Sequence, residues 1–142
     1  MGINMKNAEG YHDPTPHKAL SNINREEKAA AKAAFKPLVY ICSPFLGDEA
    51  GNIEKAKYYC RVAVDRGFMP VASHLLYPQF MDDLTEREVA MQMALVLMGK
   101  CEEVWVIGKT ISAGMAIEIE QAEYWHKRIR YFDEQMKELI DD

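Results

Sequence analysis

The regular alternation of strand-like and helix-like segments after residue 36 restricts this chain to few folds. Four short runs rich in β-branched and aromatic residues predict strands, and segments with apolar residues at helical spacing follow them. The predicted strands cover residues 37–45, 68–72, 104–107 and 128–132. Such alternation is typical of a parallel sheet with helices on both faces. We therefore predict an α/β chain with a compact flavodoxin-like or Rossmann-like three-layer fold and a four- to five-stranded parallel sheet.

The first 36 residues differ from the rest of the chain. From Lys18 to Phe35 the composition is helical, but the apolar stripe is thin and consists largely of alanines. We predict an N-terminal helical extension at residues 1–36, acting as an arm or linker, and one domain at residues 37–142. The arm could pack on a neighbouring subunit.

Capping residues and glycines predict where the helices begin and end. Expected helix starts are Asn52, the capping box Thr85–Glu88, Ser112 and Asp133. Gly67 and Gly99 are expected to end helices. Pro70 favours an edge position for the second strand. In the last predicted helix, the side chains expected to face inward are Met136, Leu139 and Ile140.

Composition excludes several classes of function. The 142 residues carry a net charge of −5, which argues against a broad basic surface for nucleic acid. No apolar run is long enough to cross a bilayer, and the N-terminus lacks the apolar segment of a signal peptide. The cysteines and histidines show no metal-ligand spacing, and no glycine-rich phosphate motif follows a strand. We expect a cytoplasmic protein that binds no metal, cofactor, nucleic acid or membrane.

The segment from Glu102 to Tyr124 predicts a ligand site, because it reads as strand, short loop and helix start. In open α/β sheets, ligands bind outside the carboxyl ends of strands, near helix N-termini. Gly114 is a poor helix residue, and Glu118 lies four residues later on the same face. A small ligand could therefore lie over Gly114 against the Glu118 carboxylate. The alternative is close packing of the helix on a strand at Gly114, with Glu118 solvated.

Residues 73–83, SHLLYPQFMDD, form a predicted loop after the second strand, on the same side of the sheet. Its aromatic and acidic side chains could hold and protonate a heterocycle; they are His74, Tyr77, Phe80, Asp82 and Asp83. Equally, the aromatic pair could anchor the loop to the body, and the two aspartates could precede the next helix. His74 could also satisfy nearby backbone groups.

Two stretches resemble a known family. Residues 40–45, YICSPF, resemble the opening motif of nucleoside 2-deoxyribosyltransferases, in which a tyrosine precedes small residues and Pro-Phe. Residues 112–119, SAGMAIEI, resemble that family's acid-bearing loop and helix start. The similarity covers residues 37–133. It is closest to a phage and bacterial branch with HLLYPQF-like stretches, near the N-glycosidases of 2'-deoxynucleoside 5'-monophosphates.

The resemblance implies cleavage of the N-glycosidic bond of 2'-deoxynucleosides or their monophosphates, as a hydrolase or a transferase of nucleotide metabolism. Glu118 would be the nucleophile, Tyr40 would orient its carboxylate, and Asp82 or Asp83 would protonate the leaving base. Phe80 could help to keep that acid protonated. The resemblance also implies a homo-oligomer, a dimer or higher, without a cofactor. Substrate contacts would come from Ser43, Pro44, Phe45, His74, Phe80, Ser112, Gly114 and Met115.

Three positions depart from the family pattern. Ser112 stands where transferases usually carry an aspartate, and it resembles the monophosphate branch, where a serine contacts the phosphate. Leu46 stands where a basic residue for the phosphate is expected, for which Lys109 could compensate. The spacing around Ala116-Ile117 is only partly kept. These departures leave open a non-catalytic protein that binds a nucleotide or an ADP-ribose-type ligand, and an assembly protein that acts through its N-terminal arm.

Overall fold

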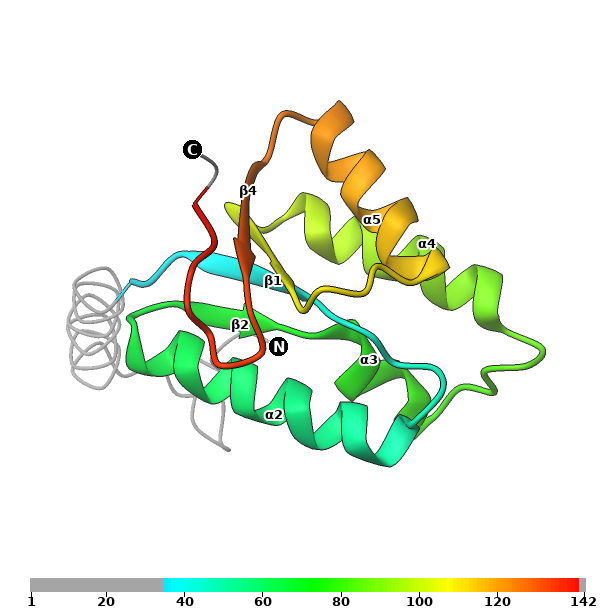
Figure 1. Ribbon diagram of the computed structural model, residues 1–142. Helices are drawn as coiled ribbons and strands as arrows, with labels where there is room; N and C mark the ends of the chain where they lie inside the picture. The colour runs from blue at the N-terminus through cyan, green and yellow to red at the C-terminus, as the bar shows by residue number, and fades with distance from the viewer. Residues whose placement is uncertain (1–34, 141–142) are drawn as a thin grey trace, which may run out of the picture. The chain divides into compact units, whose positions relative to one another are not determined.

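The computed structural model describes residues 35–140, and within them the predicted α/β architecture is confirmed (Figure 1). Almost all of the predicted N-terminal arm lies outside the described residues, so the division of the chain at residue 36 stays a prediction. The strands are β1 (Leu38–Cys42), β2 (Met69–Val71), β3 (Glu103–Ile107) and β4 (Arg128–Phe132). The helices are α2 (Glu49–Asp65), α3 (Ser73–Leu76), α4 (Arg87–Gly99) and α5 (Ala113–Tyr124), with a 3-10 turn η1 (Tyr77–Gln79).

The four strands of the described range pair in parallel in the order β2-β1-β3-β4. Tyr40 of β1 is aligned with Val71 of β2 and Val104 of β3, so β1 and β3 form the centre. β2 lies at an edge, as Pro70 predicts, because proline cannot donate a ladder hydrogen bond. Both central strands are buried on both faces, which explains their continuous apolar sequences.

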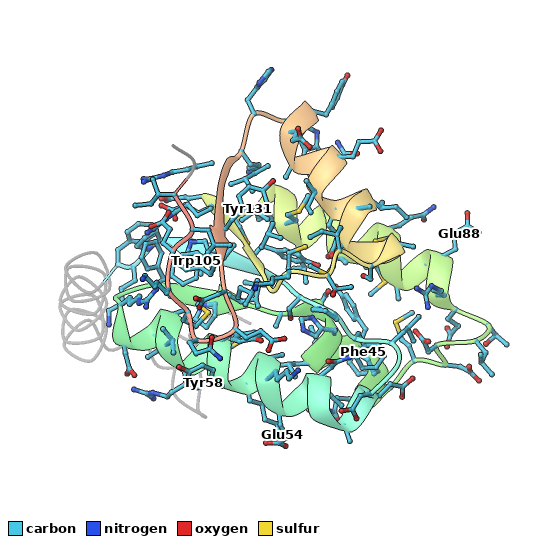
Figure 2. The ribbon with its side chains drawn as sticks, viewed as in Figure 1. Phe45, Glu54, Tyr58, Glu88, Trp105 and Tyr131 are labelled. Atoms are coloured by element: carbon cyan, nitrogen blue, oxygen red, sulfur yellow. The ribbon has the colours of Figure 1, made fainter. Side chains whose placement is uncertain are left out.

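Helices cover both faces of the sheet and complete three layers (Figure 1). On one face, Tyr40, Cys42 and Val104 pack against residues of α4 and α5, including Met98 and Met115. On the other face, side chains from the alternate strand positions, including Val39, Ile41, Trp105 and Phe132, pack against α2 and the C-terminal segment. The buried residues that α2 and that segment contribute are Tyr59, Ala63 and Met136. Figure 2 shows Trp105 inside this layer, whereas Glu54 and Tyr58 lie on the outer side of α2.

The C-terminal segment forms a turn and not the predicted helix. The Asp133 carboxylate accepts hydrogen bonds from the backbone N–H groups of Gln135 and Lys137, both at 2.9 Å, and Met136 has a φ of 63°. The chain then reverses, so that Glu138 pairs antiparallel with Phe132. Of the three residues expected to face inward, Met136 is buried, but Leu139 and Ile140 are exposed.

Two further predicted helix starts differ from the structure, and at α2 a nearby aspartate takes the capping role. Asp48 caps α2 by accepting from the backbone N–H of Gly51, while Asn52 lies inside the helix and donates to the carbonyls of Phe45 and Leu46. α4 begins at Arg87, later than the capping box at Thr85 predicts. Residues 73–79, predicted as loop, form α3 and η1. By contrast, Gly67 follows the end of α2 with a φ of +90°, and Ser112 caps α5, both as predicted.

These connections define the topological switch point of the sheet. From β1 the chain crosses to α2 on one face, and from β3 it passes into α5 on the other, so a crevice opens between the carboxyl ends of β1 and β3. Within residues 35–140, no helix has the length and apolar content needed to cross a membrane.

We predict that Trp105→Ala destabilises the fold far more than Trp125→Ala. The Trp105 ring is fully buried between Phe68 and Phe132, with ring centroids at 4.9 and 4.8 Å, whereas Trp125 is 41% exposed. Removing a buried tryptophan costs about 3–5 kcal/mol. Urea denaturation followed by circular dichroism measures the free energy of unfolding of each variant. Equal losses for the two variants would contradict the central role of Trp105.

Candidate active site

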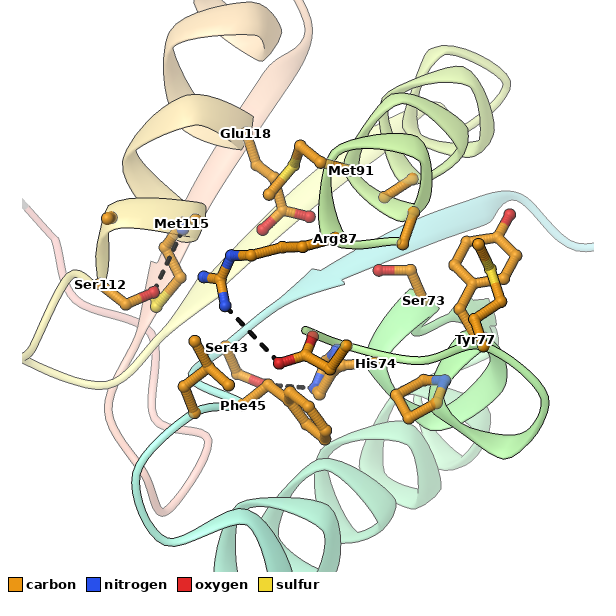
Figure 3. A pocket seen from close by; sticks show the side chains of 18 of the residues that line it. Ser43, Phe45, Ser73, His74, Tyr77, Arg87, Met91, Ser112, Met115 and Glu118 are labelled. Carbon is orange, nitrogen blue, oxygen red and sulfur yellow. Dashed lines mark hydrogen bonds and ion pairs between the residues drawn. The ribbon is translucent and has the colours of Figure 1, made fainter. Parts of the chain in front are cut away.

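A cavity of about 220 Å³ lies at the carboxyl ends of β1 and β3 (Figure 3). Its walls come from the loop after β1, from α3 and η1, from the loop before α4, and from α4 and α5. The charged, polar and sulfur-containing lining residues are Ser43, Ser73, His74, Tyr77, Met81, Asp82, Asp83, Arg87, Met91, Ser112, Met115 and Glu118. The cavity therefore combines segments that are far apart in the sequence, as expected at a topological switch point.

Glu118 is the buried acid of this cavity, with 8% of its surface exposed. α5 places it there because Ser112 caps the helix by accepting from the Met115 N–H, at 3.2 Å, which fixes the first turn. Tyr40 of β1 donates its phenolic hydrogen to Oε2 of Glu118. The Cys42 thiol, two residues along the same strand, lies 3.5 Å from Oε1 and is a weaker donor.

A second hydroxyl extends this contact. Ser73, the first residue of α3, lies with its Oγ 2.8 Å from the Tyr40 hydroxyl oxygen. Because the Tyr40 hydrogen is directed to Glu118, Ser73 is the donor in this pair. The resulting chain of donors, from Ser73 to Tyr40 to Glu118, fixes the carboxylate from β1 and α3 together. Each buried polar group thus has the partner that burial demands.

Burial sets the electrostatics of this cluster. Burial raises the pKa of Glu118, while the hydrogen bonds from Tyr40 and Cys42 act in the opposite direction and favour the carboxylate. Burial, reinforced by the nearby Glu118 charge, raises the pKa of Tyr40 and of Cys42 well above their ordinary values. Tyr40 and Cys42 therefore remain protonated donors around neutral pH.

His74 contributes a neutral imidazole to the opposite wall. Its Nε2 lies 3.0 Å from the Ser43 Oγ, and its ring packs edge-on against Phe45 with centroids 6.4 Å apart. Burial lowers the pKa of His74 to about 4. At neutral pH this side chain is therefore a hydrogen-bonding group without charge.

The two aspartates both line the cavity, but they have different partners. The Asp82 carboxylate accepts from the backbone N–H groups of Leu84 and Thr85, at 2.8 and 3.4 Å, and so stabilises the turn before α4. The Asp83 carboxylate faces the guanidinium of Arg87, with an Oδ2–Nη1 distance of 3.7 Å. Both side chains lie near the mouth of the cavity, since Asp82 is exposed and Asp83 is 38% exposed.

Gly114 allows α5 to approach α4 closely. A Cβ placed on Gly114 would lie 3.3 Å from the terminal methyl group of Met91, the neighbouring atom of α4. Gly114 and Met115 both line the cavity beside Glu118. The alternative reading was wrong, because Glu118 is buried and not solvated, and the neighbour of Gly114 belongs to helix α4 and not to a strand.

The structure does not bring every predicted site residue to this cavity. Tyr40, Pro44 and Phe80 are not among its lining residues. Tyr40 contacts the lining residue Glu118, whereas Phe80 is 64% exposed and packs edge-on against Tyr77 with ring centroids 6.1 Å apart. Phe80 is therefore not placed to keep a cavity acid protonated. Lys109 is exposed and does not line the cavity either. The structure therefore does not place it where it would replace the basic residue expected at position 46.

Three residues of the site were missed by the sequence interpretation. Cys42 and Ser73 contact the Tyr40–Glu118 pair, and Arg87 lines the cavity. The alternation of side chains along β1 could have identified Cys42, which shares the face of Tyr40. Arg87 could have been found from its place near a predicted helix start, four residues after Asp83. In the described part of the chain, no group of three or more metal-binding side chains is close enough to hold a metal ion.

We predict that His74 makes the fold less stable at acidic pH. Because its folded pKa is about 4 and its ordinary value is 6.5, the unfolded chain takes up the proton first as the pH falls. The loss of folding stability begins near pH 6.5 and is complete below pH 4. It reaches about 3 kcal/mol, because each unit of pKa difference corresponds to about 1.4 kcal/mol. In His74→Gln the free energy of unfolding should lack this component.

Urea titrations of both proteins between pH 7 and pH 4 measure the difference. The raised pKa of Glu118 acts in the opposite direction, since it favours the folded state as the pH falls, but it is present in both proteins. Parallel stability curves for the parent and the variant would refute the assignment to His74.

The fold resembles that of a known enzyme. The solved structure of a 2-deoxyribosyltransferase from the psychrotolerant bacterium Bacillus psychrosaccharolyticus matches with a TM-score of 0.55 and 18% sequence identity. The match covers 73% of this chain and 77% of the other. At this identity the likeness concerns the fold, a nucleoside deoxyribosyltransferase-like α/β arrangement.

Comparison of the sequence with known families finds a match over most of the chain, whereas comparison with curated proteins finds none. One family model matches residues 37–132, which contain all four strands and the Tyr40, Ser73 and Glu118 cluster. The chain belongs to the family described as a domain of unknown function, DUF7768.

Proposed function

We propose that the protein cleaves the N-glycosidic bond of 2'-deoxynucleosides or their 5'-monophosphates, by hydrolysis or transfer, with Glu118 as the nucleophile. The observation that carries the proposal is the buried Glu118 carboxylate, which lines a cavity and is held by hydrogen bonds from Tyr40 and Cys42. A carboxylate fixed in this way suits attack on an anomeric carbon. The fold shared with a 2-deoxyribosyltransferase supports the same reaction class.

In the first proposed step, a Glu118 oxygen bonds to C1' of the deoxyribose as the bond from C1' to the base breaks. The base nitrogen takes the electron pair and a proton from a carboxylic acid, for which Asp82 and Asp83 are the candidates. Oε1 is the better placed oxygen, because its partner is the weak thiol donor Cys42 while Oε2 is held by Tyr40.

In the second step, water or another base attacks C1' and displaces Glu118. The attacking group gives its proton to the aspartate that acted as the acid, and the Glu118 carboxylate is restored. The apolar part of the cavity, which includes Phe45, Tyr77 and Met91, provides surface for the base and sugar. Neither of these two proposed steps requires a cofactor.

A binding role without cleavage is the alternative, in which the cavity holds a nucleotide or an ADP-ribose-type ligand. One feature favours it: burial raises the pKa of Glu118 and so opposes the ionised form that a nucleophile needs. The departure at Ala116-Ile117 gives it little support, because both residues are exposed on α5 and neither lines the cavity.

Release of free base should depend on Glu118. The protein would be incubated with each of the four deoxynucleosides and their 5'-monophosphates, and free base measured by chromatography. Glu118→Gln should lose activity by at least about a thousandfold, as expected when a catalytic nucleophile is removed. Glu120→Gln is the matched control, because Glu120 is exposed on the same helix and does not line the cavity.

Base released equally by both variants would eliminate Glu118 as the nucleophile. Thermal stabilisation by a nucleotide without any base release would favour the binding role.

Tyr40→Phe should shift the acid side of the activity profile to higher pH. The hydrogen bond from Tyr40 lowers the pKa of Glu118, so its removal raises that pKa further. Because the nucleophile must be ionised, activity as the pH falls should then be lost at a higher pH than in the parent. The pH dependence of kcat/KM measures the shift. An unchanged acid limb would mean that Tyr40 does not act on Glu118.

A further inference from the structure

Arg87 is the single permanently charged cation among the described residues that line the cavity. The lining also includes the carboxylates of Asp82, Asp83 and Glu118, while His74 is neutral at pH 7. An anionic group on a ligand is repelled by each of these carboxylates. Arg87 is therefore the point at which a negative charge can enter the cavity favourably.

The guanidinium of Arg87 has unused hydrogen-bonding capacity. It carries five N–H donors. Within residues 35–140 it makes one ion pair, with Asp83 at 3.7 Å, which is longer than a hydrogen bond, and it makes no hydrogen bond. The side chains are 48% and 38% exposed, so this pair is held weakly in water. Figure 3 shows the Arg87 side chain extending from α4 into the cavity, on the side of Ser112.

Asp83 can move away from its present position more easily than Asp82, because the two carboxylates have different partners. The Asp82 carboxylate holds two backbone N–H groups of the turn before α4, so the local fold fixes it. Arg87 is the ion-pair partner of Asp83. A phosphate offers Arg87 two oxygens in the spacing of its planar fork, and such bidentate contacts are stronger than a long pair with one carboxylate oxygen.

We propose that Arg87 recognises the 5'-phosphate of the ligand and that Asp83 is the group this phosphate displaces. The inference rests on the proposed function and makes 2'-deoxynucleoside 5'-monophosphates, and not free nucleosides, the preferred ligands. Phosphate binding then also frees Asp83, one of the two candidates for the proton-transferring group, from its ion pair with Arg87. Asp82 remains in its turn.

The test measures binding separately from cleavage. Isothermal titration in a Glu118→Gln background prevents turnover, and each deoxynucleoside is compared with its 5'-monophosphate. Adding Arg87→Gln should weaken monophosphate binding by about tenfold to a hundredfold, the loss expected for a charged hydrogen-bonded contact. Nucleoside binding should change by less than about threefold. Asp83→Asn should instead strengthen monophosphate binding, because it removes the competing carboxylate.

Arg61→Gln is the matched control. Arg61 forms an ion pair with Asp65 at the same spacing of four residues, but on α2 and away from the cavity lining. It should leave both affinities unchanged, while Arg87→Lys should recover part of the monophosphate affinity. Circular dichroism melting of each variant shows that the fold is kept.

Equal losses for nucleosides and monophosphates in Arg87→Gln would overturn the inference, and so would an unchanged monophosphate affinity or weaker binding in Asp83→Asn. The proposed function is judged independently, by base release from the parent protein. Loss of monophosphate selectivity in Arg87→Gln with no base release by the parent would support the role of Arg87 and refute the glycosidase activity.

Discussion

The hydrogen bond from Tyr40 to Glu118 ties the centre of the sheet to the helix that follows the neighbouring strand. Both side chains are buried, so each depends on the other for a partner that water would otherwise supply. Ser73 adds a contact from α3 to the same hydroxyl group. Three elements far apart in sequence therefore meet at one carboxylate, and the packing of the core and the geometry of the cavity are determined together.

Much of the fold could be predicted from local sequence. The apolar runs of β1 and β3, the edge proline of β2, Ser112 at the start of α5 and Gly67 after α2 all act through short-range physics. The Gly114 and Glu118 spacing located the cavity wall for the same reason, because four residues span about one helical turn. Tyr40 was found through resemblance to a family, since nothing in its own strand indicates a role beyond packing.

What sequence reasoning missed depends on competition between nearby groups or on tertiary contacts. Asp48 accepts from the backbone N–H of Gly51 and so caps α2 in place of Asn52. Asp82 stabilises the turn at Leu84, and α4 begins after it without a side-chain cap. The C-terminal turn is fixed from outside, because Arg130 of β4 binds the Glu138 carboxylate at 2.7 and 3.0 Å. The local sequence pattern at residues 133–140 predicts a helix, but it does not show that Glu138 binds Arg130. The spacing of four residues between Asp83 and Arg87 was visible in the sequence, but that Arg87 lines the cavity depends on the tertiary packing of α4.

The contrast in burial between the two halves of the cavity has a consequence for how such proteins diversify. Tyr40 and Glu118 lie in the core, where a substitution endangers the whole fold, whereas Asp83 and Arg87 lie on exposed positions whose replacement costs little stability. Mutations can therefore accumulate at the rim while the buried pair persists. The shape and charge of the cavity entrance can thus change while the contact between Tyr40 and Glu118 stays the same.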